Sequence, residues 1–396
     1  MSDLFWPGIE RADGLFDDAA LLAAMVAVEQ AWLDALVDAG TAPTRVDLSG
    51  LLGPDDLPAL ARAAEAGGNP AQPVALALRE RSGSAWVHRG LTSQDVVDTA
   101  LALCLRDVAD TIASEVAGQV SRLAELAGEH RSTLMAGRTL AQHAVPITFG
   151  SKVTGWLTGV LDAADRLGAL ALPAQLGGAA GTLSAVTELA GSAADATALV
   201  DATAARLDLV AVVPWHTSRG KVTAAGDALL SCTDAWGRIA TDVVTLSRPE
   251  LGEVSELAPG GSSTMPHKRN PVLSVLIRRA ALAAPPLAAT LHTAAALAGD
   301  ERPDGPWHAE WAALRDLARR TVVAGSQATD LLAGLRVDGD RMRATARGAW
   351  SDLTAERVAI AAFSGTDVGT DNYLGTSDAL IDAVLARAAT YLQSAS

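Results

Sequence analysis

Cysteine is nearly absent from this chain of 396 residues, which has only two, Cys104 and Cys232. Both lie in apolar, helix-like stretches, so we expect buried reduced thiols rather than a disulfide or a cysteine-based metal site. This favours a cytoplasmic protein. Aromatic side chains are also scarce, at 4%, whereas alanine and leucine are abundant and β-branched residues are few. The composition therefore favours helices over sheets and predicts an all-α fold.

Positive charge is in deficit, since 31 Lys and Arg face 46 Asp and Glu and give a net charge of −15. A basic surface drives nonspecific binding to nucleic acid and to anionic membranes, so we expect neither partner. The first residues lack a basic segment followed by an apolar core, and no secretory signal is expected. Two uncharged runs, 167–187 and 280–299, reach the length of a membrane span, but Pro173 and the Pro285-Pro286 pair interrupt them. We interpret both as packed soluble segments.

Several catalytic motifs are missing. The chain has no G-x-S-x-G, no H-E-x-x-H, no paired C-x-x-C and no G-x-G-x-x-G after a strand. Hydrolysis by a serine nucleophile, zinc chemistry and nucleotide cofactors are therefore unsupported, and we expect no metal and no organic cofactor. Strand alternation, internal repeats and low-complexity linkers are absent from the pattern as well.

Helical periodicity is what the sequence has instead. An apolar face predicts one helix over 17–40, which ends at Gly40. A second apolar face predicts a helix of about 25 to 30 residues, long enough to imply a bundle of long neighbours. It is formed by Leu101, Leu105, Val108, Ile112, Val116, Val120 and Leu123. Further helices are predicted over 146–170, 192–207, 223–246 and 271–298.

Polar, glycine-rich segments separate these helices, and helix ends are where a bundle assembles ligand sites. The segment GGSSTMPHKRNP, residues 260–271, combines a flexible backbone with hydroxyls, two cations and an amide. Such a loop suits an anionic ligand. Ser262 acts as a base only where donors stabilise its alkoxide.

Two other segments, HRGLTSQD and GRTLAQHAVP, carry small neutral donors ahead of helices. These donors suit a carboxylate, although each one alone is as readily a helix cap or a turn. They are Thr92, Ser93, Gln94, Thr139 and Gln142. Four histidines have the chemistry of a proton carrier, and each is also open to a structural role. These are His88, His143, His216 and His308.

Taken together, these segments resemble the three signature regions of the fumarase/aspartase superfamily, and the resemblance covers nearly the whole chain. GSSTMPHKRNP is similar to the superfamily's signature loop, LTSQD to its first region and GRTLAQ to its second. The resemblance implies an all-α fold with a central bundle of long helices and two smaller helical domains. It divides the chain into 1–97, a central bundle over 98–330 with the signature loop at 256–271, and a shortened C-terminal domain over 331–396. It also implies a homotetramer whose active sites are shared between subunits.

The resemblance also assigns roles. Ser262 is the implied catalytic base, and Lys268 and Asn270 contact a substrate carboxylate. The remaining implied substrate contacts are Thr92, Ser93, Thr139 and Gln142. His143 is a candidate for a further catalytic hydrogen bond, with a structural role equally open, and His88 is a candidate substrate contact. Cations near the matched segments would balance an anionic substrate. They are Arg138, Arg219, Lys268 and Arg302, with a structural ion pair or surface position as the alternative for Arg138 and Arg302.

One departure from the superfamily pattern points to a particular branch. Many members have a histidine directly after the threonine of the second region, where this chain has Leu140. Bacterial 3-carboxy-cis,cis-muconate cycloisomerases have an apolar residue there, and AGGNPAQPV, QLGGAAGTL, PWHTSR and WHAEW resemble their segments. Gly220 stands where that branch suggests an acidic residue, and the chain is shorter than expected after Trp350.

The resemblance thus implies an enzyme that converts 3-carboxy-cis,cis-muconate to 4-carboxymuconolactone, in the protocatechuate branch of aromatic catabolism. In reverse this reaction is a β-elimination with a carboxylate leaving group, which departs without a strong general acid. A related lyase that eliminates an amine, nitrite or a similar group from a substituted succinate is the alternative. A noncatalytic member is a third hypothesis, which the retained serine and lysine of the signature loop oppose.

Overall fold

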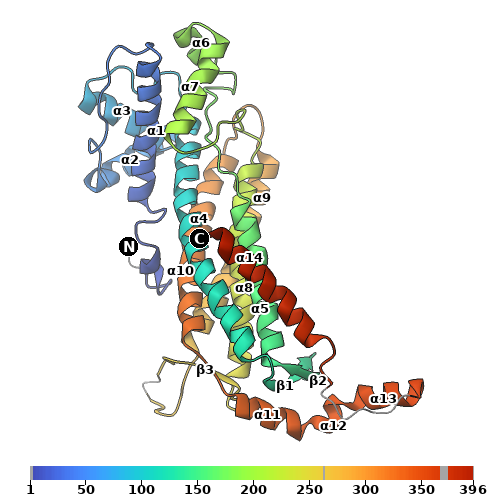
Figure 1. Cartoon of the computed structure of the whole chain (residues 1–396). Helices are drawn as coiled ribbons and strands as arrows, with labels where there is room; N and C mark the ends of the chain where they lie inside the picture. Colours follow the sequence, from blue (N-terminus) through green and yellow to red (C-terminus); the bar gives the residue numbers. More distant parts are fainter. Residues whose placement is uncertain (1–2, 262–263, 366–372, 396) are drawn as a thin grey trace. The chain divides into compact units, whose positions relative to one another are not determined.

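The computed structural model describes residues 3–261, 264–365 and 373–395, and most of these residues lie in helices (Figure 1). The all-α prediction is confirmed. The helices are α1 (Asp18–Asp38), α2 (Leu57–Gly67), α3 (Ala71–Ser82), α4 (Ser93–Glu129), α5 (Phe149–Gly168), α6 (Ser184–Ala190), α7 (Ala193–Arg206), α8 (Gly220–Leu246), α9 (Val272–Leu297), α10 (Pro306–Ala333), α11 (Gly339–Gly348), α12 (Trp350–Leu353), α13 (Ala355–Ser364) and α14 (Ser377–Ala395), with short 3₁₀ turns η1 (Ile9–Ala12) and η2 (Pro54–Asp56).

Four short strands accompany the helices in the part of the chain that the structure describes, and they were not expected from the sequence. An antiparallel hairpin joins β1 (Leu134–Thr139) to β2 (Gln142–Thr148), and β3 (Val254–Glu256) pairs with β4 (Leu335–Val337). Alternation is hard to recognise in LMAGRT and QHAVPIT because small residues and a proline replace the usual β-branched positions. Both sheets have two strands, so the fold class does not change.

The chain forms two compact units. The first contains residues 1–111, 169–230 and 284–323, and the second contains 112–168, 231–283 and 324–396. Helices α4, α8, α9 and α10 each contribute residues to both units. This division follows spatial proximity, so the three domains expected along the sequence stay a prediction.

In the first unit, α1 packs against α3 and α7 (Figure 1). Asp17 caps α1, because its carboxylate accepts a hydrogen bond from the backbone N–H of Ala20 at 2.9 Å. Trp32, Leu33 and Leu36 are fully buried on the packed face. The helix predicted over 17–40 is therefore present, with the core that its apolar face required.

Helix α4 is 37 residues long and exceeds the predicted length. All seven apolar positions that predicted it are buried, from Leu101 to Leu123. Seven of its first eight residues are also buried, among them the charged residues Asp95 and Asp98. The first turns of α4 therefore need partners for buried charge.

In the second unit, α14 lies along α5, and the β1–β2 hairpin contacts α11 and α12 (Figure 1). Trp156 is fully buried in α5 and packs edge-on against Phe149, with ring centroids 5.7 Å apart. Its indole N–H donates to Asp242 at 2.8 Å. Trp236 occupies a similar position in α8, where its ring fills the space that a side chain at Gly325 would need.

Two helices, α1 and α9, are long and apolar enough to cross a membrane by length and composition. The core helix of a soluble protein passes the same test, and half of the apolar window of α1 is buried in the protein. The run over 167–187 is not one helix, since α5 ends at Gly168 and α6 begins at Ser184. Of the two runs considered above, only the second forms a long helix, α9, which contains Pro285 and Pro286.

A buried ion-pair cluster joins three segments of the first unit. The Arg219 guanidinium donates to Asp98 at 2.6 Å and to Glu310 at 2.6 Å, and all three side chains are at most 1% exposed. The Trp307 indole donates to Asp98 at 2.8 Å. Burial raises the pKa of Glu310, although the neighbouring Arg219 opposes this.

We predict that Arg219→Met destabilises the protein strongly, because it leaves two buried carboxylates without their cation. The expected loss in the free energy of unfolding is about 3–5 kcal/mol. Urea denaturation followed by circular dichroism measures it. Arg315→Met is the matched control. The side chains of Arg315 and Asp18, which form an ion pair, are 40% and 54% exposed, and such a surface pair is worth at most about 1 kcal/mol. Equal losses for the two variants would show that the buried cluster contributes no more than a surface pair.

Candidate active site

The first signature region lies at the start of α4, in the first unit. Thr92 precedes the helix, and its backbone N–H donates to Asp95 at 2.9 Å. The same carboxylate accepts hydrogen bonds from the backbone of Gly177 at 2.8 Å and of Gly178 at 3.0 Å. Asp95 is fully buried, so it fixes the loop around Thr92 against the 175–178 segment. Thr92 and Ser93 are both partly exposed at this fixed helix start.

Arg302 reaches the same place from the segment before α10. Its guanidinium donates to the hydroxyl oxygen of Thr92 and lies 5.9 Å from the ring centroid of Trp307. Its Nε atom is buried and has no hydrogen-bond partner among the described residues. A half-buried guanidinium with an unsatisfied Nε atom, beside a threonine hydroxyl, suits an anionic group. The structure therefore brings together two of the predicted substrate contacts, Thr92 and Arg302.

His88 lies in the same loop, four residues before Thr92. Its Nδ1 atom lies 2.6 Å from the carboxylate of Glu29, which is fully buried in α1. His216, another predicted proton carrier, is buried against Gln175, at 3.1 Å, and its carbonyl accepts from Gln94 at 2.9 Å. These contacts give His216 a structural role in the described chain, which was the alternative for each histidine.

The second signature region lies in the β1–β2 hairpin of the second unit, and β2 leads directly into α5 at Phe149. Thr139 ends β1, and Gln142 and His143 begin β2. Leu140 and Ala141 form the turn, with φ of 49° and 64°. All five residues from 139 to 143 are exposed, and Leu140 is 98% exposed. The hairpin thus presents its polar side chains outward.

Arg138, in contrast, already has an ion-pair partner within the second unit. Its guanidinium forms a bidentate ion pair with Glu253, with distances of 2.8 and 3.0 Å, and Glu253 is fully buried. Arg219 is committed in the same way to Asp98 and Glu310. Of the four cations considered for an anionic substrate, two therefore already neutralise buried carboxylates.

The signature loop belongs to the second unit and is held at both ends. Glu256, which is 5% exposed, accepts hydrogen bonds from the backbone and hydroxyl of Ser274 at 2.9 and 2.7 Å, and so caps α9. Gly260 and Asn270 pair as an isolated bridge, with both N–H···O distances at 2.9 Å. A Cβ atom at Gly260 would come within 2.2 Å of Val272, so glycine is required there.

The loop that the Gly260–Asn270 bridge closes carries the predicted polar residues. The Asn270 side chain donates to the carbonyl of Gly261 at 3.3 Å, and the Lys268 side chain is exposed. Ser262, the predicted base, lies outside the described residues. The two units therefore divide the predicted site: Thr92, Ser93, Arg302 and His88 belong to the first, and the hairpin and signature-loop residues belong to the second.

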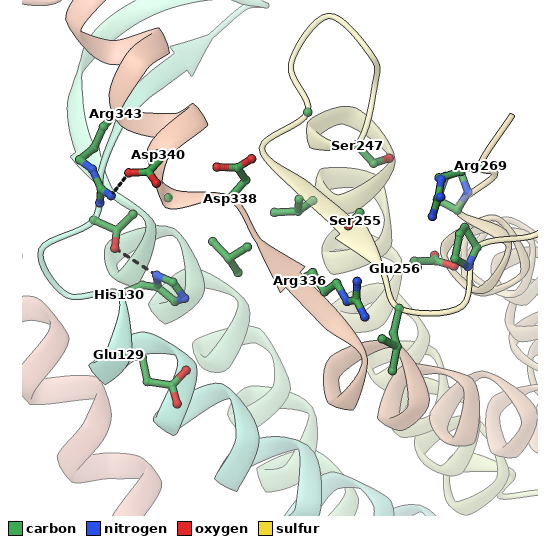
Figure 2. Close-up of a pocket in the computed structure, with 18 residues that line it drawn as sticks. Glu129, His130, Ser247, Ser255, Glu256, Arg269, Arg336, Asp338, Asp340 and Arg343 are labelled. Atoms are coloured by element: carbon green, nitrogen blue, oxygen red, sulfur yellow. Dashed lines mark hydrogen bonds and ion pairs between the residues drawn. The ribbon is translucent and has the colours of Figure 1, made fainter. Parts of the chain in front are cut away.

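A cavity of about 680 Å³ adjoins the signature loop within the second unit (Figure 2). Its acidic residues already have partners: Glu256 caps α9, Asp338 caps α11, Asp340 pairs with Arg343, and Glu129 pairs with Arg122. Burial lowers the pKa of His130, another lining residue.

Among the described residues, no group of three or more His, Cys, Asp or Glu side chains is arranged to hold a metal ion.

Three residues that position this site were not identified from the sequence. Asp95 follows Thr92 by three residues, a spacing typical of a helix cap, so that pattern was available. Glu29 is a charged residue on the apolar face of α1, which is a weaker signal. Glu256 gave no signal, since the residues it caps, Leu273 and Ser274, belong to a helix that starts beyond the loop.

We predict that Glu256→Ala loosens the base of the signature loop. It removes a charged cap from α9, which should cost about 1–3 kcal/mol of unfolding free energy. Hydrogen exchange should rise at residues 257–275 but not in α5. Glu250→Ala, an exposed position in the preceding turn, is the control. Unchanged exchange at Ser274 would contradict the capping role.

Comparison with known proteins shows the family to which this chain is related. Residues 68–284, more than half of the chain, match the family model described as a lyase. The chain is 45% identical over 360 residues to a nitrosuccinate lyase of Streptomyces davaonensis, covering 86% of this chain and 76% of that protein. It is 36% identical over 362 residues to a 3-carboxy-cis,cis-muconate cycloisomerase of Pseudomonas putida, covering 87% and 84%.

A crystal structure agrees with these sequence matches. The 3-carboxy-cis,cis-muconate lactonizing enzyme from Pseudomonas putida superposes with a TM-score of 0.82 at 30% identity, and the match covers 97% of both chains. The resemblance drawn from the signature regions is thereby confirmed. The chain belongs to the lyase family of the fumarase/aspartase superfamily, and it is an enzyme of that superfamily.

Proposed function

We propose that this enzyme eliminates nitrite from nitrosuccinate and yields fumarate. One observation carries this proposal: Arg138 and Arg219 form ion pairs with buried carboxylates. Of the four cations considered, Lys268 and Arg302 therefore remain to bind substrate carboxylates. Two cations match the two carboxylates of nitrosuccinate, whereas 3-carboxymuconate has three. The 45% identity to a nitrosuccinate lyase supports the same choice.

In the proposed mechanism, Ser262 removes the proton from the carbon next to the one that carries the nitro group. The adjacent carboxylate takes up the developing charge as an aci-carboxylate, which Lys268 and Asn270 stabilise. One C–H bond and one C–N bond break, a C=C bond forms, and nitrite leaves with the electron pair. The proton remains on Ser262 until solvent takes it up. Thr92, Ser93 and Arg302 bind the other carboxylate, and Thr139 and Gln142 complete the substrate contacts.

Nitrite is a leaving group that agrees with the lack of a proton donor at Leu140 in the hairpin turn. Leu140 occupies the position where many superfamily members have a histidine, and it offers no proton. Nitrite is the anion of an acid that is ionised at neutral pH, so it departs without protonation, unlike ammonia, an amine or water. His143 lies three positions further, next to Gln142, and contributes at most a hydrogen bond.

The second candidate is the cycloisomerase reaction first inferred from the sequence. The TM-score of 0.82 to a lactonizing enzyme and the 36% identity to a cycloisomerase favour it, and its carboxylate leaving group also needs no acid at Leu140. In this reaction a carboxylate adds across a double bond, and Ser262 returns a proton to carbon. It requires a third cation for the third carboxylate.

The test compares both substrates with one enzyme preparation. We predict that nitrosuccinate gives equal amounts of nitrite, measured colorimetrically, and fumarate, measured by ultraviolet absorbance. Ser262→Ala and Lys268→Met should lower kcat/KM about 10²–10⁴-fold. Lys221→Met, an exposed lysine of α8, should match the wild type. Loss of the diene absorbance of 3-carboxymuconate without nitrite release from nitrosuccinate would replace this proposal with the second candidate.

We further propose a homotetramer with shared active sites, in the cytoplasm. Large apolar side chains of α9 are exposed in the single chain, including Val275 at 52%, Leu282 at 75% and Leu297 at 66%. An exposed apolar stripe of this kind marks an association surface. The free, buried thiols of Cys104 and Cys232 support a reducing compartment.

Leu282→Glu should break this assembly, because it places a charge on the proposed interface. Light scattering coupled to size exclusion is expected to give a mass below that of a tetramer for this variant and a tetramer for the wild type. Leu76→Glu, on α3, is the control, since Leu76 is 56% exposed elsewhere. A tetramer for Leu282→Glu would exclude this face of α9.

A further inference from the structure

Glu29 is a buried acid that the proposed mechanism does not use. It lies on the packed face of α1, beside Val28 and Trp32, and is 0% exposed. Its Oε2 atom has no hydrogen-bond partner among the described residues. Burial of a carboxylate that is only half satisfied costs free energy, so a purely structural role leaves this residue unexplained.

The other oxygen of Glu29 holds His88. The Oε1–Nδ1 distance is 2.6 Å, which is short enough for a charge-assisted hydrogen bond. A carboxylate accepts, so Nδ1 is the donor and the ring's remaining nitrogen, Nε2, is available for another partner. The His88 side chain is 17% exposed, so the imidazole is mostly enclosed but still accessible.

The backbone around His88 is held in a strained form. His88 has φ of 63°, which is unfavourable for a residue with a side chain. Arg79 of α3 donates to the carbonyl of Val87 at 2.8 Å, and Trp32 of α1 donates to the carbonyl of Arg89 at 2.7 Å. With the Glu29 contact, three consecutive residues are therefore anchored to two helices. This preorganises the imidazole instead of leaving it on a mobile loop.

The charges indicate what the imidazole contacts. Glu29 contacts Nδ1 of His88, so the Nε2 edge of the imidazole is the part that can contact a ligand. His88 precedes Thr92 by four residues in a loop that Asp95 and Glu29 both fix. Thr92 already receives the guanidinium of Arg302. This end of the first unit is therefore prepared for an anionic oxygen.

We propose that Glu29 is a positioning residue that orients the imidazole of His88, so that Nε2–H donates to an anionic oxygen of the dicarboxylate substrate bound at Thr92. This inference rests on the proposed function for the identity of the substrate. Glu29 does not touch the substrate, and its effect passes through His88. A positioning role of this kind predicts that substitutions of the two residues are not additive.

The test is a double-mutant cycle with Glu29→Gln and His88→Ala, read as kcat and KM for nitrosuccinate and as Kd for fumarate by calorimetry. Glu29→Gln keeps the size of the side chain and removes its charge. We expect it to weaken kcat/KM about 10-fold or more, mainly through KM, by analogy with the loss of other orienting carboxylates. In the His88→Ala background the same change should alter kcat/KM less than about 2-fold.

Gln30→Ala is the matched control in the same helix. Gln30 accepts from the backbone of Leu48 at 2.6 Å and donates to the carbonyl of Val46 at 3.1 Å, so its loss should lower the melting temperature without acting through His88. Its effect should be the same in both backgrounds. Additive losses for Glu29→Gln and His88→Ala, or wild-type kcat/KM for Glu29→Gln, would overturn the proposal.

Fumarate binding separates this inference from the proposed function. If nitrosuccinate is not turned over but the two substitutions still couple in the Kd for fumarate, the reaction is wrong and the positioning role stands. Normal turnover with additive substitutions overturns the positioning role alone. If the wild type neither binds fumarate nor turns over nitrosuccinate, both fail.

Discussion

Buried negative charge at the start of α4 is the constraint on which the first unit depends. Asp95 and Asp98 lie within the first two turns of the helix and are at most 1% exposed. Asp95 is satisfied by the backbone of Thr92, Gly177 and Gly178, and Asp98 by Arg219 and Trp307. Because carboxylates are costly to bury unpaired, these partners must be present together. Their geometry therefore fixes the loop that carries the first signature region.

The same principle limits which cations remain for a ligand. From the sequence, Arg138 and Arg219 are as plausible as Lys268 and Arg302 for an anionic substrate. Their partners, Glu253 for Arg138 and Asp98 and Glu310 for Arg219, are distant in sequence and become neighbours only in the fold. Pairing of this kind has no local pattern, so the sequence could not separate structural cations from cations free for substrate. The fold makes that separation, and the dicarboxylate substrate proposed above is based on it.

The helices were predictable for a physical reason. The face from Leu101 to Leu123 recurs with the helical period, and all of its residues are buried. The hairpin was not predictable, because its strands are short and rich in small residues, and its stability comes from contacts with α11 and α12. Among site residues, Asp95 had a readable capping pattern, whereas Glu29 and Glu256 act on partners that only the fold brings near. Local sequence patterns were therefore enough to predict the helices. The arrangement of the site also depends on charged residues whose partners are distant in sequence.

In the homotetramer proposed above, with active sites shared between subunits, we propose that Thr92 of one subunit and Lys268 of another act on the same substrate. This proposal is tested most directly by complementation between Thr92→Ala and Lys268→Ala chains carrying different affinity tags. Each variant alone should be nearly inactive with nitrosuccinate. Mixed tetramers isolated through both tags should recover activity, at about one quarter of the sites if chains mix at random. Mixed tetramers with no more activity than the parent variants would contradict the shared site.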